Sequence, residues 1–173
     1  MQPRQPLPRL WLMTDERLGE RLLPAVERLP TGAGIVFRHY SLSEPERRRL
    51  FDRVAEIARQ RQLMLLLAGA ADQALAWGAD GSHGRGRGAG LRSAPVHDLA
   101  EIRAAERDGA ALIFLSPVFA TRSHPEARPL GPARFNFLAR RTDLPVIALG
   151  GMDDVRVRRV REAYGWGGID AWA

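Results

Sequence analysis

Residues 145–151 read Pro-Val-Ile-Ala-Leu-Gly-Gly, and the interpretation of the whole chain starts from this stretch. Its apolar run is short and unbroken, which is typical of a strand buried on both faces. Gly150 and Gly151 end the run, and a helical pattern follows over 153–163. Glycines between a buried strand and a helix let backbone N–H groups approach an anion, and the helix dipole adds to the attraction. The stretch therefore predicts a phosphate site, with an ordinary tight turn as the alternative.

Short apolar runs of the same kind recur along the chain, and helical patterns lie between them. The other predicted strands are 10–13, 34–37, 63–67, 79–83, 91–96, 111–115 and 168–173. Ser43 with Glu46, and Asp98 with Glu101, have the spacing of capping boxes that begin helices. Weaker helical patterns cover 18–29, 71–77, 134–141 and 153–163. Pro24 should distort the first of these four helices.

Strand and helix alternate about eight times, which favours parallel strands joined by right-handed crossovers. The predicted fold class is α/β, a compact (β/α)8 TIM barrel in a single domain over 1–173, with a doubly wound open sheet as the rival. Typical barrels have about 250 residues and rarely fewer than about 200, so this barrel should lack the last helix. The open flank would expose an apolar patch, which we expect the N-terminal arm or the second subunit of a homodimer to cover.

Composition excludes several classes of protein. The 173 residues are 45% hydrophobic and 27% charged, and no apolar run approaches the roughly 18 residues of a membrane span. The N-terminus lacks the apolar core of a secretory signal, so a cytoplasmic protein is expected. Cysteine is absent and all 26 basic residues are arginine, which excludes thiolate chemistry and lysine Schiff bases. The net charge of +6 fits nucleic acid, an anionic ligand or a general bias towards arginine.

The turns after the predicted strands carry motifs in a recognisable order. They are Leu-Met-Thr-Asp at 12–15, Phe-Arg at 37–38, Ala-Asp-Gly-Ser-His at 79–83, Ser-Pro-Val-Phe-Ala-Thr at 116–121, the stretch at 145–151 and a closing Gly-Ile. As an ordered set they resemble the thiamine phosphate synthase superfamily, which also contains the thiazole tautomerases. The resemblance implies a transferase of thiamine biosynthesis that joins hydroxymethylpyrimidine diphosphate to thiazole phosphate. Mg²⁺ would neutralise the departing diphosphate.

The same resemblance implies roles for individual residues near the ends of the strands. Arg38 matches an arginine that faces the diphosphate, and Asp15 either matches a family aspartate or caps the next helix. The positions that bind the thiazole phosphate or line the pocket fall on Thr121, Ser123, Gly150, Gly151 and His83. Two family lysines are replaced by Tyr40 and His124. His124 either acts as a general acid or base at the mouth or is an exposed loop residue.

The metal site that the resemblance implies lacks its usual carboxylates. The family's Asn-Asp pair after the third strand falls on Ala68 and Gly69, and a second acidic position falls near Gly88. Mg²⁺ is therefore possible by resemblance, but no metal ligand is assigned. One hypothesis is that Arg85 or Arg87, with Arg38, replaces the ion at the diphosphate, because guanidinium groups bind phosphate oxygens bidentately. The alternative is a solvated loop over 84–88.

Three functions remain open on the sequence. The first is thiamine phosphate synthase-like chemistry with a degenerate metal site. The second is a metal-independent enzyme like the thiazole tautomerases, although their catalytic histidine falls on Pro117. The third is a non-catalytic barrel that binds a phosphorylated metabolite or a partner. The expected partners are phosphorylated thiazole or pyrimidine molecules, with no nucleic acid and no membrane.

Overall fold

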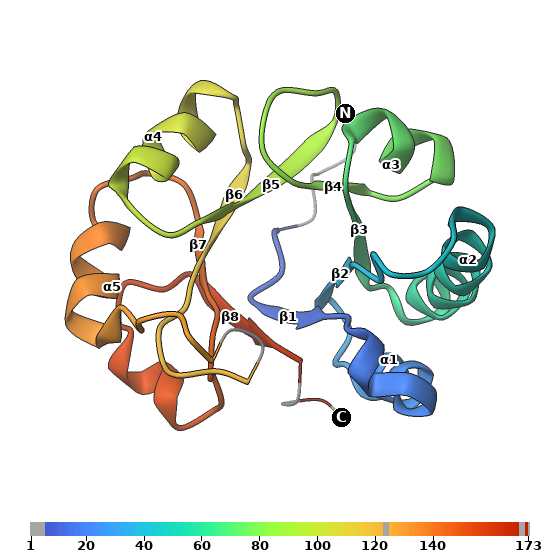
Figure 1. Cartoon of the computed structure of the whole chain (residues 1–173), viewed down its shortest axis with the longest axis horizontal. Coiled ribbons are helices and arrows are strands. Elements are labelled where there is room, and N and C mark those ends of the chain that lie inside the picture. The colour runs from blue at the N-terminus through green and yellow to red at the C-terminus, as the bar shows by residue number, and fades with distance from the viewer. Residues whose placement is uncertain (1–5, 123–124, 170–171, 173) are drawn as a thin grey trace.

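The computed structural model describes residues 6–122, 125–169 and 172. In these residues eight parallel strands follow one another around a closed barrel, with β1 also paired to β8 (Figure 1). The strands are β1 (Leu10–Met13), β2 (Gly34–Phe37), β3 (Met64–Ala68), β4 (Gly81–His83), β5 (Leu91–Val96), β6 (Leu112–Leu115), β7 (Val146–Ala148) and β8 (Gly165–Gly168). The closure confirms the predicted barrel and excludes the open sheet.

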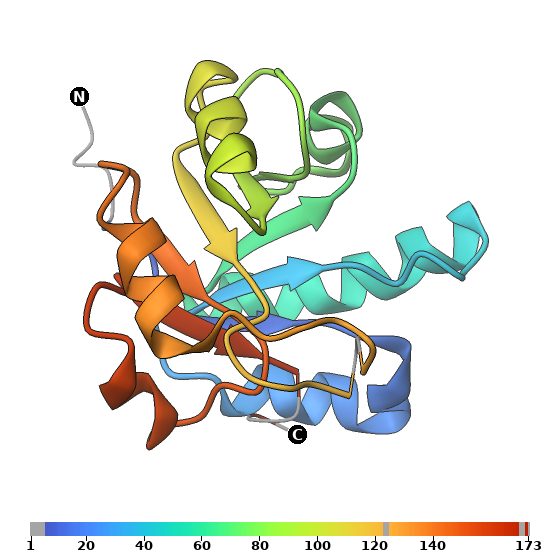
Figure 2. The same cartoon turned by 60° about the vertical axis from the view of Figure 1, so that its left-hand side comes forward.

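Helices surround the strands, as Figures 1 and 2 show. They are α1 (Leu22–Arg28), α2 (Glu44–Arg61), α3 (Ala71–Trp77), α4 (Leu99–Arg107) and α5 (Gly131–Ala139), with 3-10 turns η1 (Glu16–Arg21) and η2 (Arg156–Arg159). The predicted helix over 18–29 is broken, but the expected cause was wrong. The break lies at Gly19, which has φ 48° and ψ −126°. Pro24 lies in the first turn of α1, where proline is tolerated because its missing N–H has no partner to lose.

The helix predicted over 153–163 is also wrong. Only the four-residue turn η2 forms there, and it does not begin directly after Gly151. Asp153 caps the turn, since its Oδ1 accepts from the amides of Val155 (3.0 Å) and Arg156 (2.7 Å). No long helix dipole therefore points at the Gly-Gly turn, and any positive charge there must come from side chains.

The two predicted capping boxes differ in how far they form. At Ser43 both reciprocal hydrogen bonds are present, and α2 begins at the next residue. At Asp98 the side chain accepts from the amide of Glu101 at 2.9 Å, which confirms the N-cap of α4. The Glu101 carboxylate reaches past Asp98 and accepts instead from the amide of His97 at 2.8 Å.

Large side chains fill the barrel. The N-terminal arm lies at the end of the barrel where the strands begin. The Trp11 and Phe114 rings meet edge to face, with centroids 5.2 Å apart. The Trp11 indole N–H donates to Pro8 O at 2.8 Å, and the Tyr164 hydroxyl donates to Leu7 O at 2.7 Å. Because these contacts precede β1 and β8, the described part of the arm covers the end where strands begin, and not the open flank.

In the described residues, two flanks of the barrel are covered without any helix. Between β4 and β5 the loop 84–90 occupies the place in the ring between α3 and α4 (Figure 1). Buried Arg92 holds that loop, because its guanidinium donates to Gly86 O and to Asp108 O. These bonds replace the packing that a crossover helix would provide.

The second such flank follows β8, after which no helix is present in the described part of the chain. Trp172 stacks on Trp166 with centroids 5.5 Å apart, and its indole N–H donates to Trp11 O at 3.3 Å. A homodimer that covers the rest of this flank stays a prediction. Among the described helices, none has the length and apolar character needed to cross a membrane.

Candidate active site

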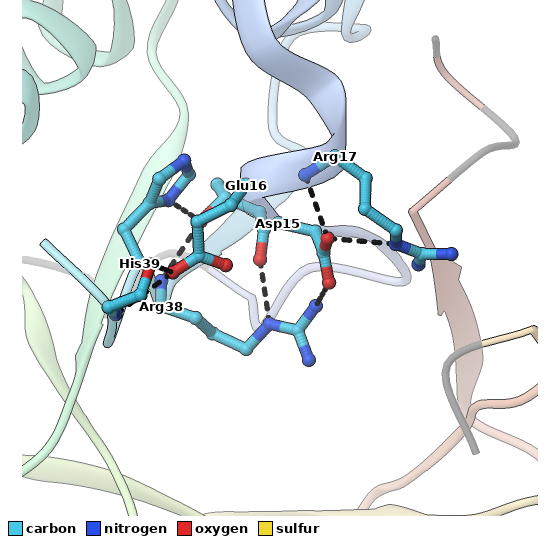
Figure 3. A network of polar contacts seen from close by, with 7 residues as sticks. Asp15, Glu16, Arg17, Arg38 and His39 are labelled. Atoms are coloured by element: carbon cyan, nitrogen blue, oxygen red, sulfur yellow. Dashed lines mark hydrogen bonds and ion pairs between the residues drawn. The ribbon is translucent and has the colours of Figure 1, made fainter.

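Arg38 and Asp15 meet where the carboxyl ends of β1 and β2 open onto the mouth of the barrel (Figure 3). Asp15 Oδ2 accepts from Arg38 Nη2 at 2.9 Å, and Oδ1 accepts from the Arg17 amide at 3.0 Å and from its Nε at 2.9 Å. Arg38 Nε also donates to Thr14 O at 2.7 Å. Asp15 therefore both caps η1 and holds Arg38, so the two interpretations of this residue are compatible.

The charges in this network are set by burial and by the neighbouring cations. Burial alone would raise the pKa of Asp15, but hydrogen bonds from Arg17 and the charge of Arg38 outweigh it, and the pKa is lowered. Burial lowers the pKa of Arg38, an effect that Asp15 partly offsets, and a guanidinium remains charged in any case. No described residue accepts from Arg38 Nη1. That edge of the guanidinium is available to an anion at the mouth.

The turn after β2 is fixed by a second set of contacts in Figure 3. Glu16 Oε1 accepts from the amide and hydroxyl of Ser41, at 3.2 and 3.0 Å. His39 is buried, and its Nδ1 lies 3.0 Å from Thr14 Oγ1. Its ring stacks on Phe37, with the two ring centroids 5.0 Å apart. His39 therefore packs in the layer between strands and helices, on the side opposite to Arg38, as strand alternation predicts.

Sequence analysis missed a third arginine at this end of the barrel, Arg47. It comes from the second turn of α2 and is only 9% exposed. Its Nε donates to Arg38 O at 2.8 Å, and its Nη2 donates to Ala68 O at 2.6 Å. The spacing along α2 could have revealed this residue. Arg47 lies four residues before Phe51 on the apolar face of the helix, where an arginine needs a structural or functional reason.

The residues at the positions of the family's metal carboxylates do not fit a Mg²⁺ site. Ala68 and Gly69 have no side-chain oxygen, and a Cβ at Gly88 would lie 2.4 Å from the Ala71 Cβ, which leaves no room for a carboxylate. Gly69 has φ 138°, a conformation that disfavours a side chain. Among the described residues, no group of three His, Cys, Asp or Glu side chains could hold a metal ion.

The structure does not bring Arg85 and Arg87 to Arg38. Arg85 Nη2 lies 2.6 Å from Glu101 Oε1, and Arg87 Nε lies 3.6 Å from Asp108 Oδ1. Both carboxylates belong to α4 or to its C-terminal end, outside the ring of strands. The arginines near Arg38 are therefore Arg17, which shares Asp15 with it, and Arg47, and not a residue of the 84–88 loop.

His83 ends β4 and points into the barrel, where its ring meets Phe114 edge to face at 5.0 Å. Burial, with a smaller contribution from the charge of Arg38, lowers the pKa of His83 to about 4. Its Nδ1 lies 2.9 Å from Ser93 Oγ, which donates to Ser82 O at 3.4 Å. His83 is therefore neutral near pH 7 and can offer a ligand hydrogen bonding and ring contact, but no positive charge.

The opposite side of the mouth is built by the turns after β6 and β7. Val118 N donates to Leu149 O at 2.8 Å, and Phe119 N donates to Gly150 O at 3.0 Å, so the two turns run together beyond the barrel. Gly150 (φ 92°) and Gly151 (φ 60°) take left-handed conformations. Their amides donate to no other residue that the structure describes. Two amides without a described acceptor at a strand end are the kind of group that binds an anion, and the phosphate site stays a prediction.

Side chains supply the positive charge that the missing helix dipole does not. Arg156 Nη1 donates to Gly151 O at 2.7 Å, and its guanidinium lies 5.4 Å from the centre of the Phe119 ring. Arg159 lies over the same ring at 5.6 Å. Thr121 belongs to the same turn after β6. The two other predicted residues of that turn, Ser123 and His124, lie outside the described residues.

The class of protein that the fold defines is a (β/α)8 barrel, with arginines on one side of its mouth and a glycine turn on the other. A family model described as thiamine monophosphate synthase matches residues 10–171. The chain belongs to the thiamine monophosphate synthase family.

Similar proteins agree with this membership. A relative from Aquifex aeolicus (strain VF5), "Putative thiamine-phosphate synthase 2", is 34% identical over 94% of this chain and 96% of its own length. The thiamine-phosphate synthase of Chloroflexus aurantiacus is 27% identical over 90% of this chain and 79% of its own. The solved thiamine phosphate pyrophosphorylase from Pyrococcus furiosus has a TM-score of 0.80 and 24% identity over 95% of this chain and 86% of that one, which supports the fold.

Gly150→Ala should destabilise the protein more than a positive φ alone explains. A Cβ at Gly150 would lie 2.7 Å from the Pro117 Cβ, whereas at Gly32 (φ 81°) no atom lies within 4 Å. We expect Gly32→Ala to lower the free energy of unfolding by about 1 kcal/mol from backbone strain, and Gly150→Ala by about 3 kcal/mol because a clash is added. Urea unfolding measures both. Equal losses would show that the Pro117 contact relaxes without cost.

Burial of neutral His83 makes stability depend on pH. Below pH 6.5 the histidine of the unfolded chain gains a proton, while the folded chain resists protonation down to about pH 4. The free energy of unfolding should therefore fall by about 3 kcal/mol from this residue as pH drops across that window, and no effect should remain above it. Urea unfolding between pH 4 and 8 should show a shallower acid slope in His83→Asn. A parallel slope in the two proteins would contradict the assignment.

Proposed function

We propose that this protein is a thiamine phosphate synthase, which joins hydroxymethylpyrimidine diphosphate to thiazole phosphate. One observation supports this most directly: two anion-binding groups lie at the same mouth but on different strands, Arg38 after β2 and the Gly150–Gly151 turn after β7. A reaction between two phosphorylated substrates needs two such groups, facing one another across the reacting atoms. A ligand with a single phosphate would use only one of them.

The two sides have different tasks in this reaction. The bond between the pyrimidine's methylene carbon and the diphosphate oxygen breaks, and its electron pair leaves with the diphosphate. The thiazole nitrogen then gives its lone pair to that carbon. Negative charge grows on the diphosphate as the bond breaks, so a fixed cation such as Arg38 stabilises the transition state more than the substrate. The Gly150–Gly151 amides, Thr121 and Arg156 hold the thiazole phosphate and orient the nitrogen.

The ring systems meet between these sides, over the inner ends of the strands. Neutral His83 and the buried Phe114 ring line this region and offer an apolar surface with one nitrogen. An uncharged histidine suits a cationic pyrimidine intermediate, because a protonated ring beside it would raise its energy. His83 is therefore proposed as a pocket residue and not as a proton donor.

Product formation from the two substrates tests this function. We expect turnover in the purified protein with EDTA as well as with Mg²⁺, since glycines stand where the metal carboxylates would be and Arg38 supplies a fixed cation at the mouth. Arg38→Met should lower kcat by roughly 100-fold, the usual cost of removing one preorganised charge-stabilising donor. The mutation of exposed Arg158 to Gln is the control and should leave the rate unchanged.

Other outcomes select among the remaining functions. Turnover only with Mg²⁺ would mean that carboxylates elsewhere hold the ion. Binding of thiazole phosphate without any turnover would favour the tautomerase-like enzyme or the non-catalytic binder. Absence of both binding and turnover would contradict every phosphate-based function.

Arg156 offers a separate test of the thiazole phosphate side. Arg156→Gln removes the cation next to Gly151 but keeps a hydrogen-bond donor, so we expect the Kd for thiazole phosphate to rise by roughly tenfold, the loss of one charge-assisted bond. Arg158→Gln removes an exposed arginine of the same turn η2 and should leave the Kd within about twofold. Calorimetric titration measures both, and equal Kd values in the two variants would show that Arg156 does not reach the phosphate.

A further inference from the structure

Arg47 is a buried cation without an acidic partner. It is 9% exposed, and no carboxylate of the described residues lies within ion-pair distance of it. Glu16 and Glu44 are the carboxylates whose charges act on Arg47, but neither forms an ion pair with it, and Glu16 accepts from Ser41. Buried charges are normally paired, because desolvation is costly. The rings of Phe37, Tyr40 and Trp77 lie 5.5 to 5.9 Å from the Arg47 guanidinium and offset part of this cost, but they do not neutralise its charge.

Its hydrogen bonds place this charge at the ends of β2 and β3. Arg47 donates to the carbonyl oxygens of Arg38 and Ala68, and its Nη1 lies 3.4 Å from Gln73 Oε1. These acceptors are neutral, so they orient the guanidinium and leave its charge in place. Two of its five N–H donors remain after these bonds. The guanidinium therefore lies against the backbone carbonyls of Arg38 and Ala68, at the ends of β2 and β3.

The carboxylates that the family resemblance implies would hold a divalent cation near the end of β3, where Arg47 contacts the Ala68 carbonyl. Gly69 and Gly88 have no side-chain oxygen to offer, and the space at Gly88 is closed by Ala71. The structure thus joins the loss of metal ligands with the gain of a permanent cation at the same strand ends. Rebuilding the metal site would need two strained or clashing substitutions.

Resting on the proposed function, we infer that Arg47 supplies the fixed positive charge that a metal ion would supply, so that diphosphate binds here without a divalent cation. Arg47 acts as a positioning residue: it holds the backbone of Arg38 and adds its charge behind the Arg38 guanidinium. Arg38 makes the direct contact. In the low-dielectric environment between strands and helices, a charge at this range is weakly screened.

Calorimetric titration with inorganic diphosphate, in EDTA and in Mg²⁺, tests this inference on the full chain. We expect the Kd of the unmodified protein to be the same in both buffers within about twofold. Arg47→Met should weaken binding by roughly tenfold or more in EDTA, while Arg47→Lys, which keeps the charge, should recover most of the affinity. Arg49→Met, which removes an exposed arginine of the same helix, is the matched control and should bind like the unmodified protein.

Thiazole phosphate binding at the other side of the mouth reports whether each variant is folded. Three results would overturn the inference: diphosphate binding that requires Mg²⁺, an unchanged Kd in Arg47→Met, or equal losses in Arg47→Lys and Arg47→Met, which would indicate a purely structural role. The first result needs no variant, so a misfolded Arg47→Met protein would not remove the test. Metal-free diphosphate binding without product formation would refute the proposed function alone. Product formation that requires Mg²⁺ for diphosphate binding would refute this inference alone.

Discussion

The barrel closes at the seam between β1 and β8, and this closure depends on the space that one indole takes. Trp11 lies on β1 at 0% exposure. A Cβ at Gly34 on β2 would lie 2.3 Å from its ring, and a Cβ at Gly167 on β8 would lie 2.8 Å from its carbonyl oxygen. Glycine at position 34 leaves room for the Trp11 ring, and glycine at position 167 lets the β8 backbone approach that of β1. Closure then forces all eight strand ends to one mouth, so residues far apart in the chain become neighbours.

Closure of the barrel also brings several arginines together at the mouth, and few carboxylates lie beside them. Arg38 is balanced by Asp15, but Arg47 is balanced only by carbonyl oxygens. On the far side, Arg156 and Arg159 lie over the Phe119 ring near Gly151. An aromatic face and backbone oxygens help to hold these guanidinium groups, and the Asp153 carboxylate, 3.7 Å from Arg156 Nε, offsets part of the charge on that side. The mouth is therefore electropositive before any ligand arrives, which favours anionic substrates over neutral ones.

The sequence predicts those features that follow from local chemistry, and it misses those that depend on long-range contacts. The barrel follows from the order of strands and helices, and the glycine turn at 150–151 follows from residue type. Arg47 is not predicted as a site residue, because it reaches the ends of β2 and β3 only when α2 packs beside them. The prediction that Arg85 joins Arg38 fails for the same reason. Arg85 lies in the loop after β4 as expected, but it pairs with Glu101 of α4. Gly19 breaks its helix because its backbone conformation there is one that only glycine adopts easily, while Pro24 fits a first turn.

A cation built into the fold differs physically from a bound ion. A metal ion enters with the substrate and can leave with the diphosphate, whereas Arg47 and Arg38 stay when the product departs. Such preorganised charge costs no reorganisation during the reaction, but it also attracts the product. Asp15 moderates that attraction, since its carboxylate takes part of the Arg38 charge and competes with the ligand for the same guanidinium. In the proposed reaction, the ion pair of Asp15 and Arg38 would set a balance between stabilising the leaving group and releasing it.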